Sequence, residues 1–279
     1  MKLISFRYDG TPGYGALTGD QVANFAALPG APADLKAAIA ADALTDLAAR
    51  AEPSLALTDV ELLPVVPNPG KILCVGHNYE DHRKETNRAK TDHPSIFTRW
   101  ADTQIAAGAP ILRPRESTML DYEGELLIVI GKGGRRIAET DALDHIAGYA
   151  CANDASVRDF QWHTTQFAPG KNFPATCASG PWLVTPDEMG AIDDKTITTR
   201  LNGTVVQQAS FAQLVFPLAR IIAYCSTFTP LSPGDVILTG TPGGVGAKRE
   251  PALWMKAGDT VEVTIDGIGT LTNPVRDEG

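Results

Sequence analysis

The chain has 279 residues, of which 43% are hydrophobic and 20% are charged, and its formal net charge is -9. This composition is typical of globular proteins, and it excludes a disordered chain and a fibrous one. An acidic chain with no run of basic residues longer than a pair predicts no nucleic-acid partner, and no apolar run reaches the ~18 residues that cross a membrane.

The first 66 residues predict a small N-terminal α/β domain. Residues 2–8 and 14–25 are typical of strands around a turn, 32–51 predicts one or two helices, and 61–66 predicts a further strand. The breaker Pro67-Asn68-Pro69-Gly70 then favours a boundary, so we expect domains at 1–66 and 70–279. Because histidine is absent before residue 77, the first domain is expected to serve packing or assembly, and the second catalysis.

The second part is rich in strands. Helices are expected at 78–87, 156–167 and 210–228, and they do not alternate with the strands, which favours an α+β fold with a mixed β-sheet or roll. Asn202-Gly203 is typical of a type I′ hairpin turn. The expected strands are 71–76, 95–98, 125–131, 147–152, 181–184, 196–201, 204–208, 235–239, 260–265 and 269–274.

Acidic residues precede the apolar run 126–130. On a strand, side chains alternate, so Asp121, Glu123 and Glu125 are expected to point the same way and to repel one another. A divalent cation would relieve this repulsion, and oxygen ligands favour Mg²⁺, Mn²⁺ or Ca²⁺. A solvated acidic strand end explains the same pattern.

A second polar segment follows the apolar stretch 146–152. Asp154 either caps a helix or completes a three-carboxylate metal site with Glu123 and Glu125. Arg158 and Gln161 are three apart and share a helix face, where Arg158 either clamps a substrate carboxylate or forms an ordinary salt bridge.

Three further features could carry chemistry. His82 and Glu85 are three apart, so they form either a general base with its orienting carboxylate or a chance pair on a polar surface helix. Lys171, in a loop flanked by Gly and Pro, is either an oxyanion stabiliser or solvated. The segment 239–246 fails the phosphate-loop pattern and is interpreted as a tight loop that brings backbone close to a ligand. His77, His93, His145 and His163 are expected to be structural or surface residues.

Five segments between residues 71 and 274, taken together and in their order along the chain, resemble the fumarylacetoacetate hydrolase family. They are 76–85 (Gly-x-Asn-Tyr-x-x-His-x-x-Glu), 121–126 (Asp-Tyr-Glu-Gly-Glu-Leu), 153–159 (Asn-Asp-x-Ser-x-Arg-Asp), 170–173 (Gly-Lys-Asn-Phe) and 239–246 (Thr-Gly-Thr-Pro-x-Gly-Val-Gly). The resemblance implies a mixed β-roll and usually a homodimer.

The resemblance also implies roles for individual residues. Glu123, Glu125 and Asp154 would be ligands of Mg²⁺ or Mn²⁺, and His82 and Glu85 would be the catalytic dyad on a mobile lid. Substrate contacts and catalytic support would come from Tyr79, Arg158, Gln161, Lys171 and Thr241. Asp121 matches the family pattern but is not assigned as a ligand.

The expected activity is hydrolysis of a carbon–carbon bond in an acylpyruvate, such as maleylpyruvate or fumarylpyruvate, to pyruvate and a carboxylic acid. Isomerisation or decarboxylation of a 2-oxo diacid in aromatic catabolism is one alternative, and a non-catalytic metal-binding protein is another. The partner is expected to be a small 2-oxo acid. A cytoplasmic location is expected because the N-terminus has no apolar signal-peptide core and the cysteines are widely spaced.

Overall fold

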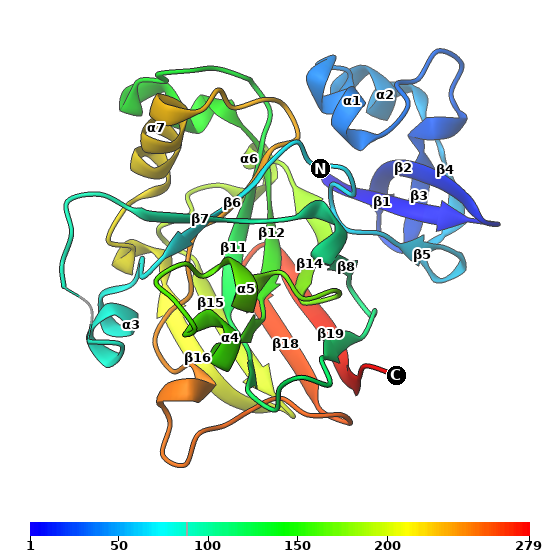
Figure 1. The fold of residues 1–279 in the computed structure, drawn as a ribbon. Helices are drawn as coiled ribbons and strands as arrows, with labels where there is room; N and C mark the ends of the chain where they lie inside the picture. Colours follow the sequence, from blue (N-terminus) through cyan, green and yellow to red (C-terminus); the bar gives the residue numbers. More distant parts are fainter. Residues whose placement is uncertain (88) are drawn as a thin grey trace.

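The computed structural model describes residues 1–87 and 89–279, and Figure 1 follows them from the blue N-terminus to the red C-terminus. The predicted strand 14–25 is two strands, because Gly19 has φ +60° and turns the chain between them. The predicted strand 61–66 is paired only at its start. The N-terminal elements are β1 (Lys2–Tyr8), β2 (Thr11–Thr18), β3 (Gln21–Asn24), α1 (Leu35–Ala40), α2 (Leu44–Arg50), β4 (Pro53–Ala56) and β5 (Glu61–Leu62).

The largest sheet has twelve strands and contains N-terminal and later strands together, because β1 pairs with β14 in antiparallel register, Lys2 opposite Val184. The N-terminal part is therefore continuous with this sheet, and the expected boundary near residue 67 stays a prediction. Beyond β1 the order runs through β14 (Cys177–Val184), β12 (Ile146–Asp154), β11 (Gly124–Ile130), β17 (Val236–Leu238), β6 (Ile72–Gly76) and β7 (Ser95–Arg99), while β8 (Gln104–Ala106) adds to β14.

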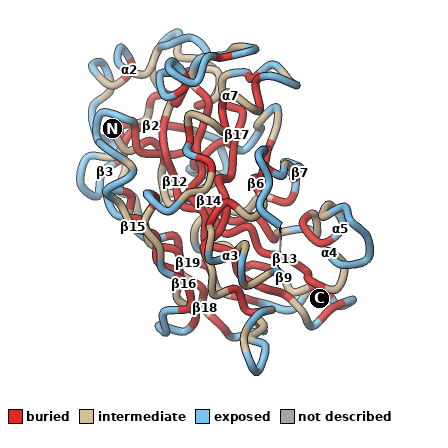
Figure 2. The backbone as a smooth tube through the Cα atoms, turned by 90° about the vertical axis from the view of Figure 1, so that its left-hand side faces the viewer, coloured by how far each residue is buried: buried red, intermediate tan, exposed pale blue. Residues whose placement is uncertain are grey.

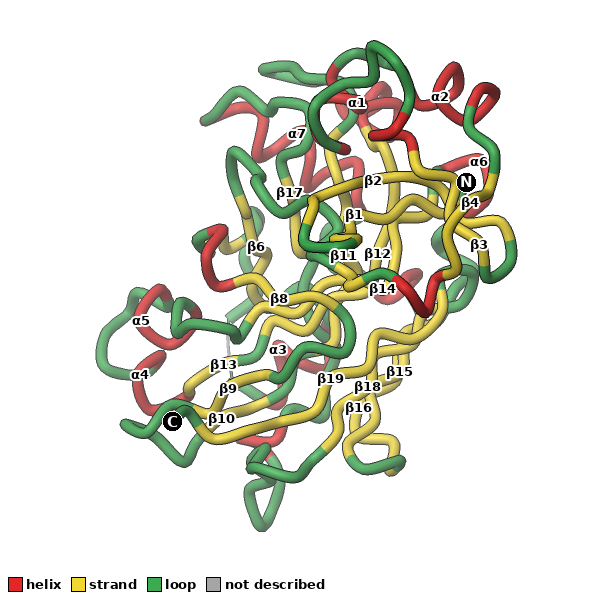
Figure 3. Tube along the Cα trace, turned by 90° about the vertical axis from the view of Figure 1, so that its right-hand side faces the viewer, coloured by secondary structure: helices red, strands yellow, loops and turns green. Residues whose placement is uncertain are grey.

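A five-stranded sheet packs beside the large one, and Figure 3 shows β15, β16 and β18 below its strands. Its order is β16 (Thr204–Ser210), β15 (Thr196–Leu201), β18 (Thr260–Ile265), β19 (Gly269–Asp277) and β9 (Ile111–Arg113), and β10 (Leu120–Asp121) pairs separately with β13 (Ser156–Val157). The predicted hairpin turn is present, with φ +51° at Asn202 and +79° at Gly203. The mixed, strand-rich α+β architecture is thus confirmed.

Strand β11 lies between two hydrophobic cores, and all seven of its residues are buried. Figure 2 shows its neighbour β12 in the buried interior of the molecule. Leu126 and Ile128 pack into the core that includes Val261 of the smaller sheet. Leu127 and Val129 point the other way, into the core that includes Leu35 of α1. A strand buried on both faces requires an uninterrupted apolar run, which explains why the charged residues lie at its end.

The helices are short. The predicted helix 156–167 contains only α4 (Arg158–Gln161), and α5 (Ala168–Lys171) follows it. The predicted helix 210–228 is broken by Pro217: Ser210 and Gln213 form the expected capping box on a short 3₁₀ turn, and α7 (Leu218–Phe228) starts afterwards. The remaining helices are α3 (Glu80–Glu85) and α6 (Pro186–Met189). Within residues 1–87 and 89–279, no helix is long and apolar enough to span a bilayer.

The double-sided burial of β11 makes a stability prediction. Leu127→Ala should lower the free energy of unfolding by about 2–5 kcal/mol, because it removes buried methyl groups and leaves a cavity. Urea unfolding of the variant measures this loss. The control Leu143→Ala, at a side chain 50% exposed, should change stability by no more than about 0.5 kcal/mol. Equal midpoints for the two variants would contradict the two-core description.

Candidate active site

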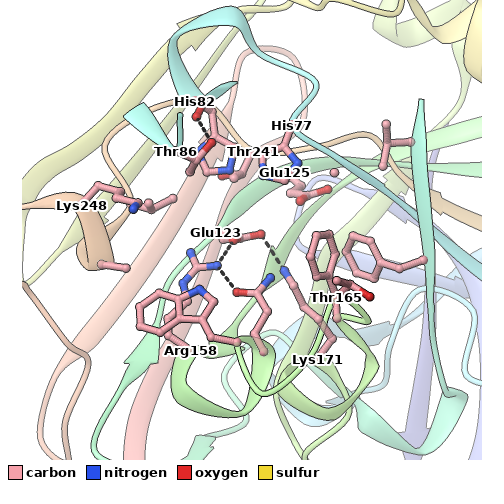
Figure 4. Close-up of a pocket in the computed structure, with 18 of the residues that line it drawn as sticks. His77, His82, Thr86, Glu123, Glu125, Arg158, Thr165, Lys171, Thr241 and Lys248 are labelled. Atoms are coloured by element: carbon pink, nitrogen blue, oxygen red, sulfur yellow. Dashed lines mark hydrogen bonds and ion pairs between the residues drawn. The ribbon is translucent and has the colours of Figure 1, made fainter. Parts of the chain in front are cut away.

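Strand directions bring distant segments to one edge of the large sheet. Strand β11 is antiparallel to both β12 and β17, and β17 is parallel to β6. The carboxyl ends of β6, β12 and β17 therefore meet the amino end of β11. A cavity of about 440 Å³ opens there. Seven of the predicted site residues line it: His82, Glu123, Glu125, Arg158, Gln161, Lys171 and Thr241 (Figure 4).

Three buried carboxylates gather beside this cavity. Glu123, Glu125 and Asp154 each offer an oxygen atom, and these atoms all lie within 4.8 Å of one another. Glu125 Oε2 accepts a hydrogen bond from Gly240 N at 2.7 Å, in the loop after β17. Burial and the neighbouring Asp154 and Glu123 carboxylates raise the pKa of Glu125 well above its usual range. The predicted carboxylate triad is therefore assembled in space.

Asp121 lies outside this triad, although its carboxylate and that of Glu123 both pair with Arg158. Strand β10 ends at Asp121 and β11 begins at Gly124, so the strand geometry is interrupted at residues 122–123. The Asp121 carboxylate instead accepts hydrogen bonds from Gly246 N at 2.8 Å and from Arg158 Nε at 2.8 Å.

Lys171 and Arg158 compensate the charge of the triad. Lys171 Nζ lies 2.7 Å from Glu123 Oε2 and 2.6 Å from Asp154 Oδ2. Arg158 Nη1 lies 2.7 Å from Glu123 Oε1. Burial alone would lower the pKa of Lys171, but the Asp154 and Glu123 carboxylates outweigh burial and raise it. Burial likewise opposes ionisation of Glu123, yet Lys171 and Arg158 lower its pKa overall. Lys171 is thus a buried cation of the site rather than a solvated loop residue.

Arg99 is a site residue that the sequence analysis did not single out. It ends β7, is buried, and donates to Asp154 Oδ1, to Ala155 O at 3.2 Å and to Thr176 Oγ1. A polar residue at the end of an apolar strand was the available signal, but its partner lies 55 positions away in the sequence.

A divalent cation fits this set of side chains. Asp121 and the triad supply four buried carboxylates, whereas Arg99, Arg158 and Lys171 supply three cations, which leaves one negative charge in excess. Within the described part of the chain, Glu125 has no Lys or Arg nitrogen at ion-pair distance. An all-oxygen donor set is the kind that Mg²⁺, Mn²⁺ and Ca²⁺ prefer.

His82 lines the same cavity, and Glu85 is its partner; the two residues are called the histidine pair below. His82 Nδ1 lies 2.7 Å from Glu85 Oε1, and Glu85 Oε2 accepts a hydrogen bond from Gly244 N at 2.9 Å. His82 is 6% exposed, and its ring stacks on His77 with centroids 5.4 Å apart. His77, which was expected to be a structural or surface residue, lines the cavity as well. Its position directly after β6 was the available signal.

The remaining predicted residues differ in their placement. Gln161 Oε1 accepts a hydrogen bond from Arg158 Nη1 at 2.8 Å, and Thr241 Oγ1 donates to Gly124 O at 2.9 Å. Both side chains therefore hold the cavity wall together as well as lining it. Tyr79 is 2% exposed and lies in the hydrophobic core, so the structure does not bring it to the cavity with the others.

Comparison with known proteins agrees with this geometry. Residues 71–276 match the family described as fumarylacetoacetate (FAA) hydrolase C-terminal. The Xenopus laevis mitochondrial oxaloacetate tautomerase fahd2 is 44% identical over 223 residues, which are 79% of this chain and 70% of that protein.

Two solved structures cover the whole chain and are covered completely by it. A fumarylacetoacetate hydrolase from Exiguobacterium antarcticum is 33% identical with a TM-score of 0.87. The maleylpyruvate hydrolase of Sphingobium sp. SYK-6, solved with manganese(II) and pyruvate, is 27% identical with a TM-score of 0.82. The chain belongs to the fumarylacetoacetate hydrolase family.

Proposed function

We propose that this protein is a divalent-metal-dependent enzyme that interconverts the enol and keto forms of a dicarboxylic 2-oxo acid such as oxaloacetate. The observation that carries the proposal is His82, which pairs with Glu85 and lines the same cavity as Glu123 and Glu125. A proton-transferring base thus faces a site suited to a cation. The oxaloacetate tautomerase of Xenopus, 44% identical, supports this substrate class.

The chain's own residues supply proton transfer and substrate binding. Bound to the triad, Mg²⁺ or Mn²⁺ would act as a Lewis acid that stabilises negative charge on the oxygen atoms of the substrate. His82 directs Nδ1 toward Glu85, so Nε2 is the nitrogen that takes a proton from the carbon next to the carbonyl and returns it. Lys171, held protonated by its carboxylate partners, keeps positive charge beside the reacting oxygen.

Arg158 is prepared to bind a carboxylate. Its Nε and Nη1 atoms are engaged by Asp121 and Glu123, whereas the buried Nη2 has no hydrogen-bond partner among the residues that the structure describes. An unpaired buried N–H of this kind is costly unless a ligand accepts from it. A substrate carboxylate at the cavity supplies that acceptor.

Hydrolysis of an acylpyruvate is the second candidate. It is favoured by the maleylpyruvate hydrolase structure, which matches the full length of the chain and contains manganese and pyruvate. In this reaction His82 would take its proton from water instead of from carbon. Release of pyruvate from an acylpyruvate distinguishes hydrolysis from tautomerisation. Inactivity in both assays with intact Mn²⁺ binding would favour a non-catalytic metal-binding protein.

The metal site is tested by Glu125→Gln. This change keeps an acceptor for Gly240 N but removes the charge that has no cationic partner, so Mn²⁺ affinity should fall by about 10–100-fold. Titration calorimetry measures the affinity, and Glu80→Gln, at an exposed carboxylate of α3, is the matched control. Parent affinity in the Glu125 variant would contradict the ligand assignment.

The base is tested by His82→Asn. Enol absorbance of oxaloacetate should decay about 10²–10⁴-fold more slowly, the usual contribution of a positioned general base, while Mn²⁺ binding is retained. Glu85→Gln should cost less, because Glu85 acts through the imidazole. The control is His93→Asn, since His93 stacks on Tyr224 outside the cavity lining. Turnover at the parent rate in His82→Asn would show that the pair is only structural.

Arg158→Lys tests the carboxylate clamp. Lysine keeps the charge but loses the planar fork, so kcat/KM for oxaloacetate should fall about 10–100-fold, the value of a hydrogen bond to a charged group. Arg220→Lys is the control, because Arg220 is 41% exposed and pairs with Glu139 at 3.6 Å. If both variants keep the parent kcat/KM, Arg158 does not bind substrate.

A further inference from the structure

Asp121 is a fully buried carboxylate that has no part in the metal triad. Its Oδ1 accepts hydrogen bonds from Tyr122 N at 2.9 Å and from Gly246 N at 2.8 Å. Its Oδ2 accepts from Arg158 Nε at 2.8 Å and from Ala247 N at 3.0 Å. One side chain thus joins the end of β10, the helix that carries Arg158 and the glycine-rich loop after β17.

These partners require the charged form of the carboxylate. All four of these partners are hydrogen-bond donors. A protonated acid would have to direct its own hydrogen at an N–H group. The anion is the form that this arrangement can accommodate.

Asp121 first fixes the position of the Arg158 guanidinium. Asp121 engages Nε, while Glu123 and Gln161 both engage Nη1, at 2.7 and 2.8 Å. The plane of the fork is therefore fixed from two sides, and Nη2 is left for a ligand.

Asp121 also fixes the glycine-rich loop 243–247. A Cβ built on Gly246 would lie 1.9 Å from Leu253 O and 2.6 Å from Asp121 Oδ1, so the loop can approach Asp121 only through a glycine. Two residues earlier, Gly244 N donates to Glu85 Oε2 at 2.9 Å. The loop that Asp121 fixes is therefore the loop that orients the carboxylate of the histidine pair.

We propose that Asp121 is a positioning residue that aligns two parts of the site, the Arg158 fork that binds the substrate carboxylate and the loop that supports Glu85. This inference rests on the proposed binding of a carboxylate substrate. It concerns substrate affinity first and proton transfer second, because the contact to Arg158 is direct and the contact to Glu85 passes through the loop.

Asp121→Asn tests the direct contact. The amide can still accept from Gly246 N, but its NH₂ group would face two donors, Arg158 Nε and Ala247 N. Affinity for pyruvate in the Mn²⁺-bound protein, measured by calorimetry, should fall about 10–100-fold. Mn²⁺ affinity itself should change by less than about threefold, since Asp121 lies outside the triad. Parent pyruvate affinity would overturn the proposal.

A matched control separates positioning from stability. Asp259 is another buried carboxylate, which accepts from Lys256 N and Asn202 Nδ2, both at 2.9 Å, away from the cavity. Asp259→Asn should lower the melting temperature and leave pyruvate affinity unchanged. If Asp121→Asn does the same, its role is structural and the proposal fails.

A double-mutant cycle of Asp121→Asn with Arg158→Lys tests whether Asp121 acts on pyruvate binding through Arg158. If Asp121 acts through Arg158, the two changes together should weaken pyruvate binding much less than the product of their separate effects. Fully multiplicative effects would overturn the proposal. Because pyruvate binding requires no turnover, absence of oxaloacetate tautomerisation would refute the proposed function without deciding this inference.

A variant that keeps the charge covers the case in which Asp121→Asn does not fold. Asp121→Glu retains the anion but displaces it by one methylene group, so Arg158 is held in a different place. Retained Mn²⁺ affinity with weakened pyruvate binding supports positioning. Unchanged pyruvate binding in Asp121→Glu shows that the position of the charge has no importance, and it rejects the proposal.

Discussion

The compensation of four buried carboxylates by three buried cations is the interaction on which this site depends. Removing an ion from water costs several kcal/mol, so each carboxylate at the amino end of β11 is tolerated only with a close partner. Arg99, Arg158 and Lys171 come from β7, α4 and α5, three elements that the fold has to deliver to one place. Glu125 is the exception, because no Lys or Arg of the described chain approaches it within ion-pair distance; its pKa is raised, and a bound cation would be the partner that it lacks.

The double-sided burial of β11 explains why this charge lies at a strand end. Both faces of β11 pack into hydrophobic cores, so ionised side chains have no place along its length. Antiparallel pairing with β12 and β17 then brings Asp154 and the loop at 239–241 to the same edge. The apolar run and the acidic segment that precedes it thus both follow from the burial of β11 on its two faces.

Local pattern was sufficient for most strands and for the candidate site residues at their ends. The strand 260–265 and the hairpin at 202–203 depend on alternation and turn chemistry within a few residues, and both are present. The apolar period of 210–228 predicts one helix, but the first turn ends at Leu214 and α7 begins only after Pro217. Arg99 and Asp121 needed partners far away in the sequence, which periodicity does not encode.

The two proposed reactions would use the same residues, so access of water to the substrate would decide between them. A base at His82 can take a proton from carbon, which gives tautomerisation, or from water, which gives hydrolysis, and the same cations would stabilise the negative charge in either case. At about 30 Å³ for each water molecule, a cavity of about 440 Å³ holds a small 2-oxo acid together with several waters. A tautomerase built on this site must therefore keep water away from the substrate carbonyl. Segment α3 carries His82 and contacts the loop through Glu85, so it is the element at which such an exclusion of water would have to act.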